Sequence, residues 1–218
     1  MEKQEIMENL ARGVVDGDPE ACRQNAREAL REGIDPLDAV EQGLSGGMGV
    51  VGDRFERGEV YLPELLMAAD AFNAAMEILR PEMEAQNKEL AKIGTVLLGT
   101  VKGDVHNIGK NIVATVLETR GFSVVDMGVD IPSLGFIEEA KKVKADVIAL
   151  SSLMTTSMPA QREVIETLKE MNLRDRYLVI VGGGPVSKEW ADQIGADGYG
   201  KSAVEAVQII KGLLATRG

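Results

Sequence analysis

The residue whose chemistry stands out first is His106, the single histidine of the chain. Asp104 lies two residues before it, and a carboxylate there can accept the Nδ1 proton, fix the tautomer and leave Nε2 free as a metal ligand or a base. Gly103 and Gly109 flank the pair and permit a tight turn and close backbone approach. A lone histidine on a loop is also commonly a surface residue or a helix cap, so both interpretations remain open here.

Two further segments carry polar or small residues. Residues 151–157 place five hydroxyl side chains within seven positions, ahead of Pro159. Such hydroxyls are typical of turns and helix N-caps, and they equally suit the lining of a polar ligand tail. Glycines occupy 182–184 and flank Tyr199, where they form turns or make room for a ligand. No Gly-Lys-Ser/Thr follows the glycine triplet, so it is not a phosphate loop.

From about residue 92, short apolar runs alternate with amphipathic stretches. The predicted strands are 94–98, 123–126, 147–150, 177–181 and 196–199, and the predicted helices include 108–120, 134–143, 160–171 and 202–214. Five βα units in succession predict a parallel sheet with helices on both faces, in flavodoxin-like rather than barrel order. Ligands bind at the carboxyl ends of the strands in such sheets, and the polar and glycine-rich segments fall there.

The first 90 residues show helical patterns without strand signals. Asp18 and Asp35 each precede a proline, as an N-cap precedes a first helical turn, and Gly33 marks the end of the second helix. An apolar stripe spans 36–56, and a long helix covers 62–87, in which Pro81 is expected to kink or break the last part. The sequence therefore predicts a four-helix bundle over 1–89, a linker at 87–91 and an α/β domain over 92–218.

Composition excludes several classes of protein. The 218 residues contain 24 Lys and Arg against 35 Asp and Glu, a net charge of −11, which argues against nucleic-acid binding. A single cysteine, Cys22, allows no internal disulfide and no zinc cluster of the usual Cys/His kind. No hydrophobic leader follows Met1 and no apolar run approaches the length of a membrane span, so we expect a cytoplasmic protein without membrane contact.

The polar segments together form a spaced pattern. Asp104-Val105-His106-Asn107-Ile108-Gly109 is followed after 41 residues by Ser151-Ser152-Leu153, and after 28 more by Gly182-Gly183. This pattern resembles that of base-off, histidine-ligated cobalamin domains. Segments at 41–44, 51–55 and 61–64 resemble the helical cap beside such domains. The chain is thus similar over nearly its whole length to the corrinoid proteins of methanol, methylamine, betaine and aryl-ether methyltransferase systems, which are related to the cobalamin module of cobalamin-dependent methionine synthase.

The resemblance implies cobalamin as cofactor, with His106 ligating cobalt through Nε2, Asp104 accepting the Nδ1 proton and Ser157 continuing the relay. The residues implied to contact the cofactor are Gly103, Asp104, Val105, His106, Asn107, Ile108 and Gly109 beneath the corrin, Ser151, Leu153, Thr155, Ser157, Gly182, Gly183, Tyr199 and Gly200 along the displaced nucleotide, and Glu41, Phe55 and Leu62 at the upper face. Phe55 and Leu62 are equally compatible with the core of the helical bundle.

The implied function is that of a methyl-carrier subunit rather than a complete enzyme, cycling between cob(I)alamin and methylcob(III)alamin. Its implied partners are a substrate-specific methyltransferase, an acceptor methyltransferase for a thiol or tetrahydrofolate, and a reductive activation protein. A cobalamin-based sensor or regulator is the alternative, although no basic DNA-binding helix is visible in the sequence. The small subunit of an adenosylcobalamin mutase would lack the helical half, and the matched spacings argue against a plain flavodoxin-like signalling domain.

Overall fold

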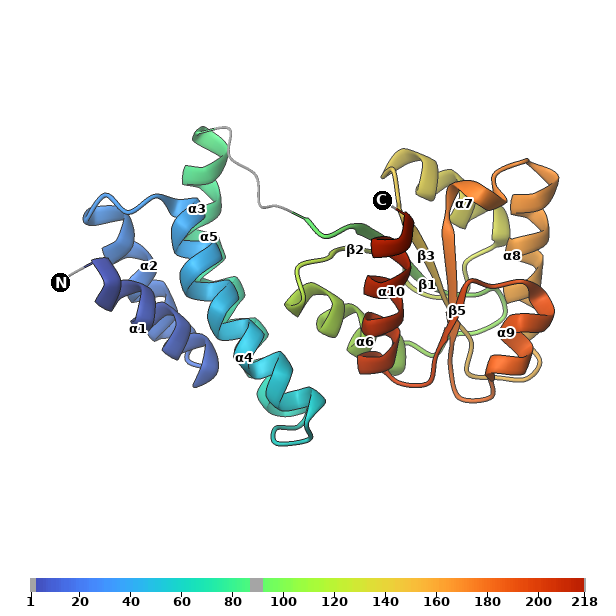
Figure 1. Ribbon diagram of the computed structural model, residues 1–218, viewed down its shortest axis with the longest axis horizontal. Coiled ribbons are helices and arrows are strands. Elements are labelled where there is room, and N and C mark those ends of the chain that lie inside the picture. Colours follow the sequence, from blue (N-terminus) through green and yellow to red (C-terminus); the bar gives the residue numbers. More distant parts are fainter. Residues whose placement is uncertain (1–2, 87–91, 218) are drawn as a thin grey trace. The chain divides into compact units, whose positions relative to one another are not determined.

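The computed structural model describes residues 3–86 and 92–217, and the chain divides into two compact units, Met1–Ala91 and Lys92–Gly218 (Figure 1). The first unit is helical, and the second is an α/β domain. The predicted linker at 87–91 lies outside the described residues.

The helical unit is the predicted four-helix bundle. Its helices are α1 (Lys3–Val15), α2 (Pro19–Arg31), a helix in three successive pieces, and α5 (Leu62–Ala85). The three pieces are α3 (Pro36–Asp38), the π-helical η1 (Ala39–Leu44) and α4 (Ser45–Glu56). Asp18 and Asp35 cap α2 and α3 as predicted, because their side chains accept hydrogen bonds from backbone N–H groups of the first turns.

Two glycines explain how closely the first and third helices pack. A Cβ atom at Gly47 would lie 2.4 Å from the carbonyl oxygen of Ala11, and one at Gly43 would lie 3.0 Å from Cβ of Leu10. Positions 43 and 47 lie one turn apart on the same helical face, so only glycine permits the backbones to approach this closely.

Helix α5 differs from the prediction at Pro81. The proline lies inside the helix, and α5 continues through it to Ala85. Burial accounts for this continuity, since Leu79 and Met83 on either side of the proline are buried in the bundle. Tertiary packing of the apolar face therefore outweighs the hydrogen bond that the proline cannot donate.

The α/β unit contains a five-stranded parallel sheet in the order β2-β1-β3-β4-β5. The strands are β1 (Thr95–Thr100), β2 (Ser123–Asp126), β3 (Val147–Ser151), β4 (Leu178–Gly182) and β5 (Gly198–Gly200). This is the flavodoxin-like order that the alternating pattern predicted. The ladder carries β1, β3, β4 and β5 one or two residues past the predicted ends, because backbone pairing continues after the apolar run has stopped.

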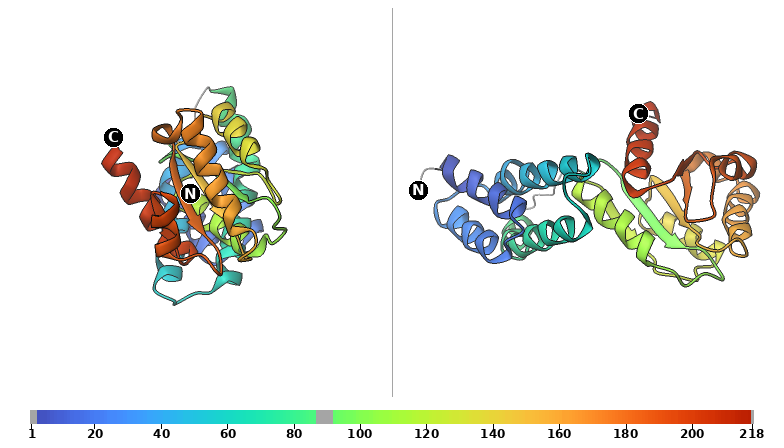
Figure 2. Two further views of the ribbon diagram at one scale, coloured as in Figure 1. Left: turned by 90° about the vertical axis from the view of Figure 1, so that its right-hand side faces the viewer. Right: turned by 90° about the horizontal axis from the view of Figure 1, so that it is seen from below.

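Helices cover both faces of this sheet (Figure 2). They are α6 (Ile108–Thr119), α7 (Ser133–Lys142), α8 (Met158–Glu170), α9 (Lys188–Ile194) and α10 (Ala203–Arg217). Helix α6 packs on α10 at one face, while α7 packs on α8 and α8 on α9 at the other. The main buried cluster, which includes Leu97, Phe136, Ile148, Ile165 and Val179, lies between the sheet and the α7–α9 layer.

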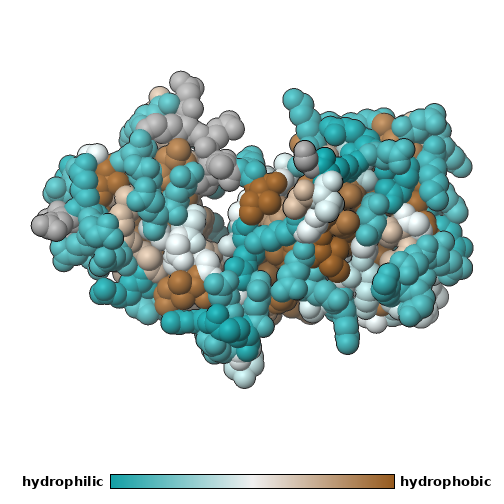
Figure 3. Space-filling model, in the orientation of Figure 1, coloured by the Kyte–Doolittle hydropathy of each residue, from teal (hydrophilic) through white to brown (hydrophobic). Residues whose placement is uncertain are grey.

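The surface that Figure 3 shows is mainly hydrophilic on both units, with hydrophobic residues in separate patches. Within 3–86 and 92–217, no helix combines the length and the apolar character that a membrane crossing requires.

Candidate functional site

The register of the sheet aligns the ends of four strands. Thr100 pairs with Ser151, Ser151 with Gly182, and Gly182 with Gly200. These four residues form one row across the carboxyl edge, and each predicted ligand segment begins at or close to one of them. Segments separated by up to 100 positions in sequence are therefore brought to a single edge, which is where doubly wound sheets bind their ligands.

At the centre of this edge lies the carboxylate of Asp104, which is fully buried. Its Oδ1 accepts hydrogen bonds from the backbone N–H of His106 at 3.0 Å and contacts His106 Nδ1 at 2.8 Å. Its Oδ2 accepts from the backbone N–H of Leu153 at 2.7 Å and from Ser157 Oγ at 2.8 Å. Both oxygens are thus fully engaged, and the carboxylate joins the β1–α6 loop to the loop after β3.

These contacts set the charge of Asp104. Burial alone would raise its pKa, but the hydrogen bonds from His106, Leu153 and Ser157 outweigh that effect and hold the pKa of this carboxyl well below its usual range. An ionised carboxylate can only accept, so His106 must present an N–H at Nδ1. The lone pair of the neutral imidazole then lies at Nε2, on a side chain that is 49% exposed.

Ser157 is buried and has a second partner that the sequence interpretation did not include. Ser152 Oγ lies 2.8 Å from Ser157 Oγ, and both hydroxyls lie within hydrogen-bonding distance of the carbonyl oxygen of Met154. The predicted set His106, Asp104 and Ser157 is therefore assembled as one chain of contacts, and Ser152 extends it by one member.

The glycines of the site fall into two groups. A Cβ at Gly183 would lie 1.8 Å from the carbonyl oxygen of Ser152, and one at Gly200 would lie 2.7 Å from Cβ of Ala206, so packing within the protein requires glycine there. A Cβ at Gly103 or Gly109 would meet nothing within 4 Å. The predicted role of Gly182, Gly183 and Gly200 in making room for a ligand tail stays a prediction.

Apolar side chains around His106 are unusually exposed. Val105 is 69% exposed, Ile108 77% and Leu153 47%. Together with the open space beside Gly103 and Gly109, they provide a surface on which a large, partly apolar ring can rest. The residues present fit cobalamin, because a corrin brings four nitrogen ligands of its own and a single imidazole would suffice as the protein's contribution.

A cluster of protein ligands for another metal is not found. Among residues 3–86 and 92–217, no group of three or more His, Cys, Asp or Glu side chains could hold an ion.

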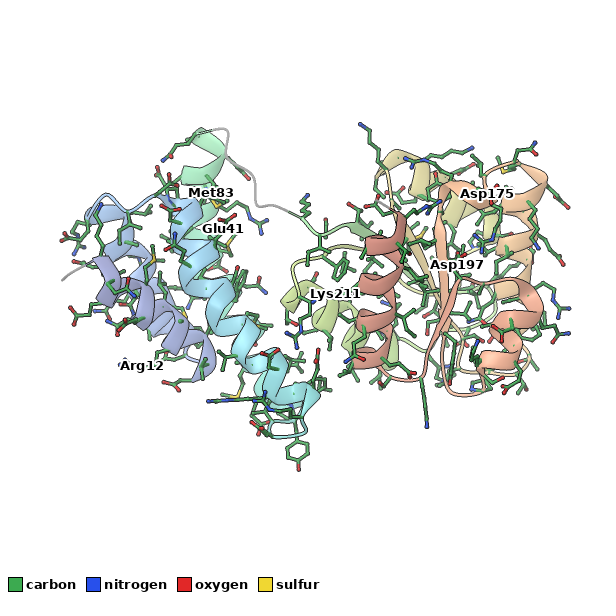
Figure 4. All side chains as sticks on the ribbon, viewed as in Figure 1. Arg12, Glu41, Met83, Asp175, Asp197 and Lys211 are labelled. Atoms are coloured by element: carbon green, nitrogen blue, oxygen red, sulfur yellow. The ribbon has the colours of Figure 1, made fainter. Side chains whose placement is uncertain are left out.

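Of the remaining predicted residues, four belong to the α/β unit and three to the helical unit. In the α/β unit, Asn107 precedes α6 and Thr155 is exposed in the loop after β3. Ser151, at the end of β3, and Tyr199, on β5, are half-buried. The three residues predicted for the upper face belong to the helical unit: Glu41 is exposed on η1 (Figure 4), while Phe55 on α4 and Leu62 at the start of α5 are half-buried. Their contact with a cofactor stays a prediction.

Two further residues support the site without having been singled out from the sequence. Lys110 is buried one residue after Gly109, and its ammonium binds Asp126 Oδ2 and Asn111 Oδ1. Asp130 binds the β1–α6 loop from the opposite side. The sequence shows only a lysine early in a predicted helix and an aspartate in a predicted turn, so neither residue carried a clear signal.

Known proteins match both units. The B12 binding domain family matches residues 94–208, and a second B12 binding domain family matches residues 6–80. The chain is 47% identical to trimethylamine corrinoid protein 1 of Methanosarcina acetivorans over 97% of this chain and 98% of that one. It is also 47% identical to dimethylamine corrinoid protein 2 of the same organism over 97% of both chains.

Solved structures agree. The crystal structure of the methanol:cobalamin methyltransferase complex MtaBC from Methanosarcina barkeri contains a chain that superposes with a TM-score of 0.89 at 32% identity, covering 97% of this chain and 80% of that one. The cofactor of the chain described here is accordingly cobalamin, and this chain belongs to the family of B12-binding corrinoid proteins.

Proposed function

We propose that this protein carries a methyl group on cobalamin between two methyltransferases, with His106 as the axial ligand of cobalt. The observation that carries the proposal is the buried, fully hydrogen-bonded Asp104, whose contact with Nδ1 leaves Nε2 of an exposed imidazole as the free acceptor. The cofactor, when bound, supplies a cobalt centre that can accept and release a methyl group.

The residues of the chain hold the ligand and its proton. Asp104 fixes the orientation of the imidazole and strengthens its donor nitrogen, as carboxylates do beside metal-bound histidines. Asp104 would keep the imidazole in place through Nδ1 whether or not Nε2 is bound to the metal. Ser157 donates a hydrogen bond to Oδ2 of Asp104, and Ser152 Oγ contacts the Ser157 hydroxyl.

The methyl donor that we propose is a methylated amine. The support is the similarity to corrinoid proteins named for trimethylamine and dimethylamine at 47% identity.

The proposed partners are a substrate-specific methyltransferase, an acceptor methyltransferase acting on a thiol or tetrahydrofolate, and a reductive activation protein. The likeness to a chain of a methyltransferase complex supports the first of these. We place the activity in the cytoplasm, which cell fractionation would test.

Replacing His106 tests the axial ligand directly. In His106→Ala, we expect the visible spectrum of the bound cofactor to change, because the axial nitrogen is lost. Lys102→Ala is the matched control, since Lys102 is exposed in the same loop. An unchanged spectrum and unchanged affinity in His106→Ala would contradict the assignment.

The carrier role is tested with the loaded chain and labelled methyl donors. We expect trimethylamine or dimethylamine, together with its methyltransferase, to transfer label to the cobalt, whereas methanol should not serve as donor. If no methyltransferase labels the cofactor and light changes the oligomeric state instead, the sensor alternative replaces the carrier.

A further inference from the structure

The loop that carries the candidate axial ligand is held by few side-chain contacts of its own. Between the end of β1 and the start of α6, Lys102, Gly103, Val105, His106 and Asn107 are all exposed. Segments with little buried apolar surface open easily, so their hydrogen bonds determine how well they keep one conformation. The partners of these hydrogen bonds therefore determine the position and orientation of His106.

One side of the loop is fixed through side chains. Asp104 is buried and tied to Leu153 and Ser157, and Thr100 Oγ1 donates to the carbonyl oxygen of His106 at 2.9 Å. These bonds fix the carboxylate and the end of the loop, and the backbone N–H of Asp104 donates to the carbonyl oxygen of Val101 at 3.2 Å at its start. They do not reach the backbone N–H of Gly103 or the carbonyl oxygen of Asp104.

The other side is fixed by the segment between β2 and α7. Asp130 Oδ1 accepts from the backbone N–H of Gly103 at 2.7 Å, and the backbone N–H of Asp130 donates to the carbonyl oxygen of Asp104 at 2.9 Å. The next residue, Ile131, donates to the carbonyl oxygen of Thr100 and forms a parallel bridge with Val101. Asp130 thus binds two consecutive residues of the loop, one with its side chain and one with its main chain.

The backbone of Asp130 restricts which residue can do this. Its φ is +57°, in the left-handed region where glycine, asparagine and aspartate are tolerated far better than other residues. Of these three, only aspartate and asparagine also bring a short side-chain oxygen that can accept the N–H of Gly103. Gly103 itself has φ +82°, so both partners of this hydrogen bond adopt backbone conformations that few residue types accept.

We infer that Asp130 is a positioning residue for the axial histidine, because it holds the Gly103–Asp104 backbone in the conformation that directs His106 toward the cofactor. The inference rests on the proposed function for His106 as the ligand. Asp130 acts through the loop and contributes no ligand itself. Without the side-chain oxygen of Asp130, the loop would keep the hydrogen bonds of the buried Asp104 carboxylate and lose the one that holds the backbone N–H of Gly103.

The test compares three variants of the full chain. Asp130→Asn keeps both the left-handed conformation and an acceptor oxygen. Asp130→Gly keeps the conformation and loses the acceptor. Asn172→Gly is the matched control, because Asn172 has the same φ of +57° after α8, outside this loop. Comparing the two glycine variants separates the loss of the hydrogen bond from the effect of adding a glycine.

The first measurement uses the chain without cofactor. We expect the amide proton of Gly103 to exchange with solvent about fivefold faster in Asp130→Gly, as the loss of one hydrogen bond predicts, and at the original rate in Asp130→Asn and Asn172→Gly. The second uses the cobalamin-loaded chain, labelled with 15N at its single histidine and reduced to the cobalt(II) state. A coordinated 15N nitrogen splits the paramagnetic resonance signal into doublets, whereas the cofactor's own 14N base would split it into triplets. We expect Asp130→Gly to lower the fraction of histidine-coordinated cobalt and to weaken cobalamin binding about fivefold, with Asp130→Asn within twofold of the original chain.

The outcomes separate the inference from the function on which it rests. If the labelled original chain shows triplets instead of doublets, the ligand assignment fails and the functional part of the inference falls with it, whatever the Asp130 variants do. If the original chain shows doublets while Asp130→Gly matches it in amide exchange and cobalamin affinity, Asp130 is not a positioning residue and the proposed function stands. An equal loss in Asp130→Asn and Asp130→Gly would also overturn the inference, because asparagine keeps the accepting oxygen.

Discussion

In the described part of the helical unit, every buried side chain is apolar apart from the thiol of Cys22, whereas the described part of the α/β unit buries seven polar or charged side chains. They are Thr100, Asp104, Lys110, Ser133, Ser152, Ser157 and Gln161. A buried polar group destabilises a protein unless it is hydrogen-bonded, and each of these seven has a partner. Most of them lie at or near the carboxyl ends of the strands, where the ligand site is.

The charge of the two units differs as strongly. Residues 1–91 contain 9 Lys and Arg against 20 Asp and Glu, while residues 92–218 contain 15 of each, so the helical unit carries the entire net charge of −11. The helical unit thus keeps its charges on the surface and its core apolar, and the α/β unit uses balanced charges and buried hydrogen bonds. The difference teaches that the total charge of a chain says little about the environment of its functional site.

The strongest expected contrast lies in the helical core. Leu79 is fully buried on α5, so Leu79→Ala should lower the free energy of unfolding of the helical unit by about 3–4 kcal/mol through the cavity it leaves. The single tryptophan, Trp190, reports only on the α/β unit. Denaturation followed by circular dichroism should show the loss, while Trp190 fluorescence should keep its original midpoint; a shift of both would mean that the units unfold together.

Asp104→Asn probes the buried polar network of the α/β unit. Whichever way the amide is turned, its NH₂ group faces a backbone N–H, of His106 or of Leu153, and we expect a loss of about 2–3 kcal/mol at neutral pH. The folded pKa of Asp104 lies below its unfolded value, so its stabilisation is complete above about pH 4 and is lost as the pH falls further.

Urea denaturation at a series of pH values checks this dependence. The difference between the original chain and Asp104→Asn should shrink as the pH falls below about 4. A difference that stays constant into acid would show that the charge of Asp104 does not contribute.

A reciprocal exchange tests whether each core requires its own chemistry. Gln161 Nε2 donates to the carbonyl oxygens of Leu150 and Gly182, and Gln161 Oε1 accepts from Trp190 Nε1. Gln161→Met keeps a similar side-chain volume but leaves these three partners without their hydrogen bonds to residue 161. Met76→Gln places an amide in the apolar core of the helical unit. Each should cost about 2 kcal/mol, measured by urea denaturation; a neutral Gln161→Met would show that the α/β unit tolerates an apolar core at this position.

The smallest expected effects concern helix caps, in which the two units should not differ. Asp18 caps α2 by accepting from the N–H groups of Glu20 and Ala21, and Ser187 caps α9 by accepting from that of Trp190. Asp18→Ala and Ser187→Ala should each lower stability by about 1 kcal/mol in thermal denaturation. A much larger loss in one unit would mean that its cap has a tertiary role as well.

Much of the fold could be predicted because it depends on local patterns. The caps at Asp18 and Asp35, the strand 123–126 and the alternation of apolar runs with amphipathic helices follow from residue types and their periods. The π-helical piece at 39–44 and the uninterrupted passage of α5 through Pro81 were not predicted, since both depend on how the helices pack against each other.

The candidate site divides in the same way. Asp104 and His106 were found because they lie two residues apart, and Ser157 entered through a resemblance in spacing. Ser152 and Asp130 were missed, because a serine among other serines and an aspartate in a turn show no pattern until the chain is folded. Their partners lie 5 and 27 residues away in sequence, beyond what local periodicity reports.

The sequence by itself determined the helical and α/β character of the two units, the parallel sheet and the one histidine that can serve as a metal ligand, because periodicity and residue chemistry are local properties. Only the tertiary structure decided the environment of that histidine. The sheet register aligns Thr100, Ser151 and Gly182, and this alignment closes the hydrogen bonds around Asp104 that fix its charge and the tautomer of His106. Such contacts form between loops that are adjacent only after the strands have paired.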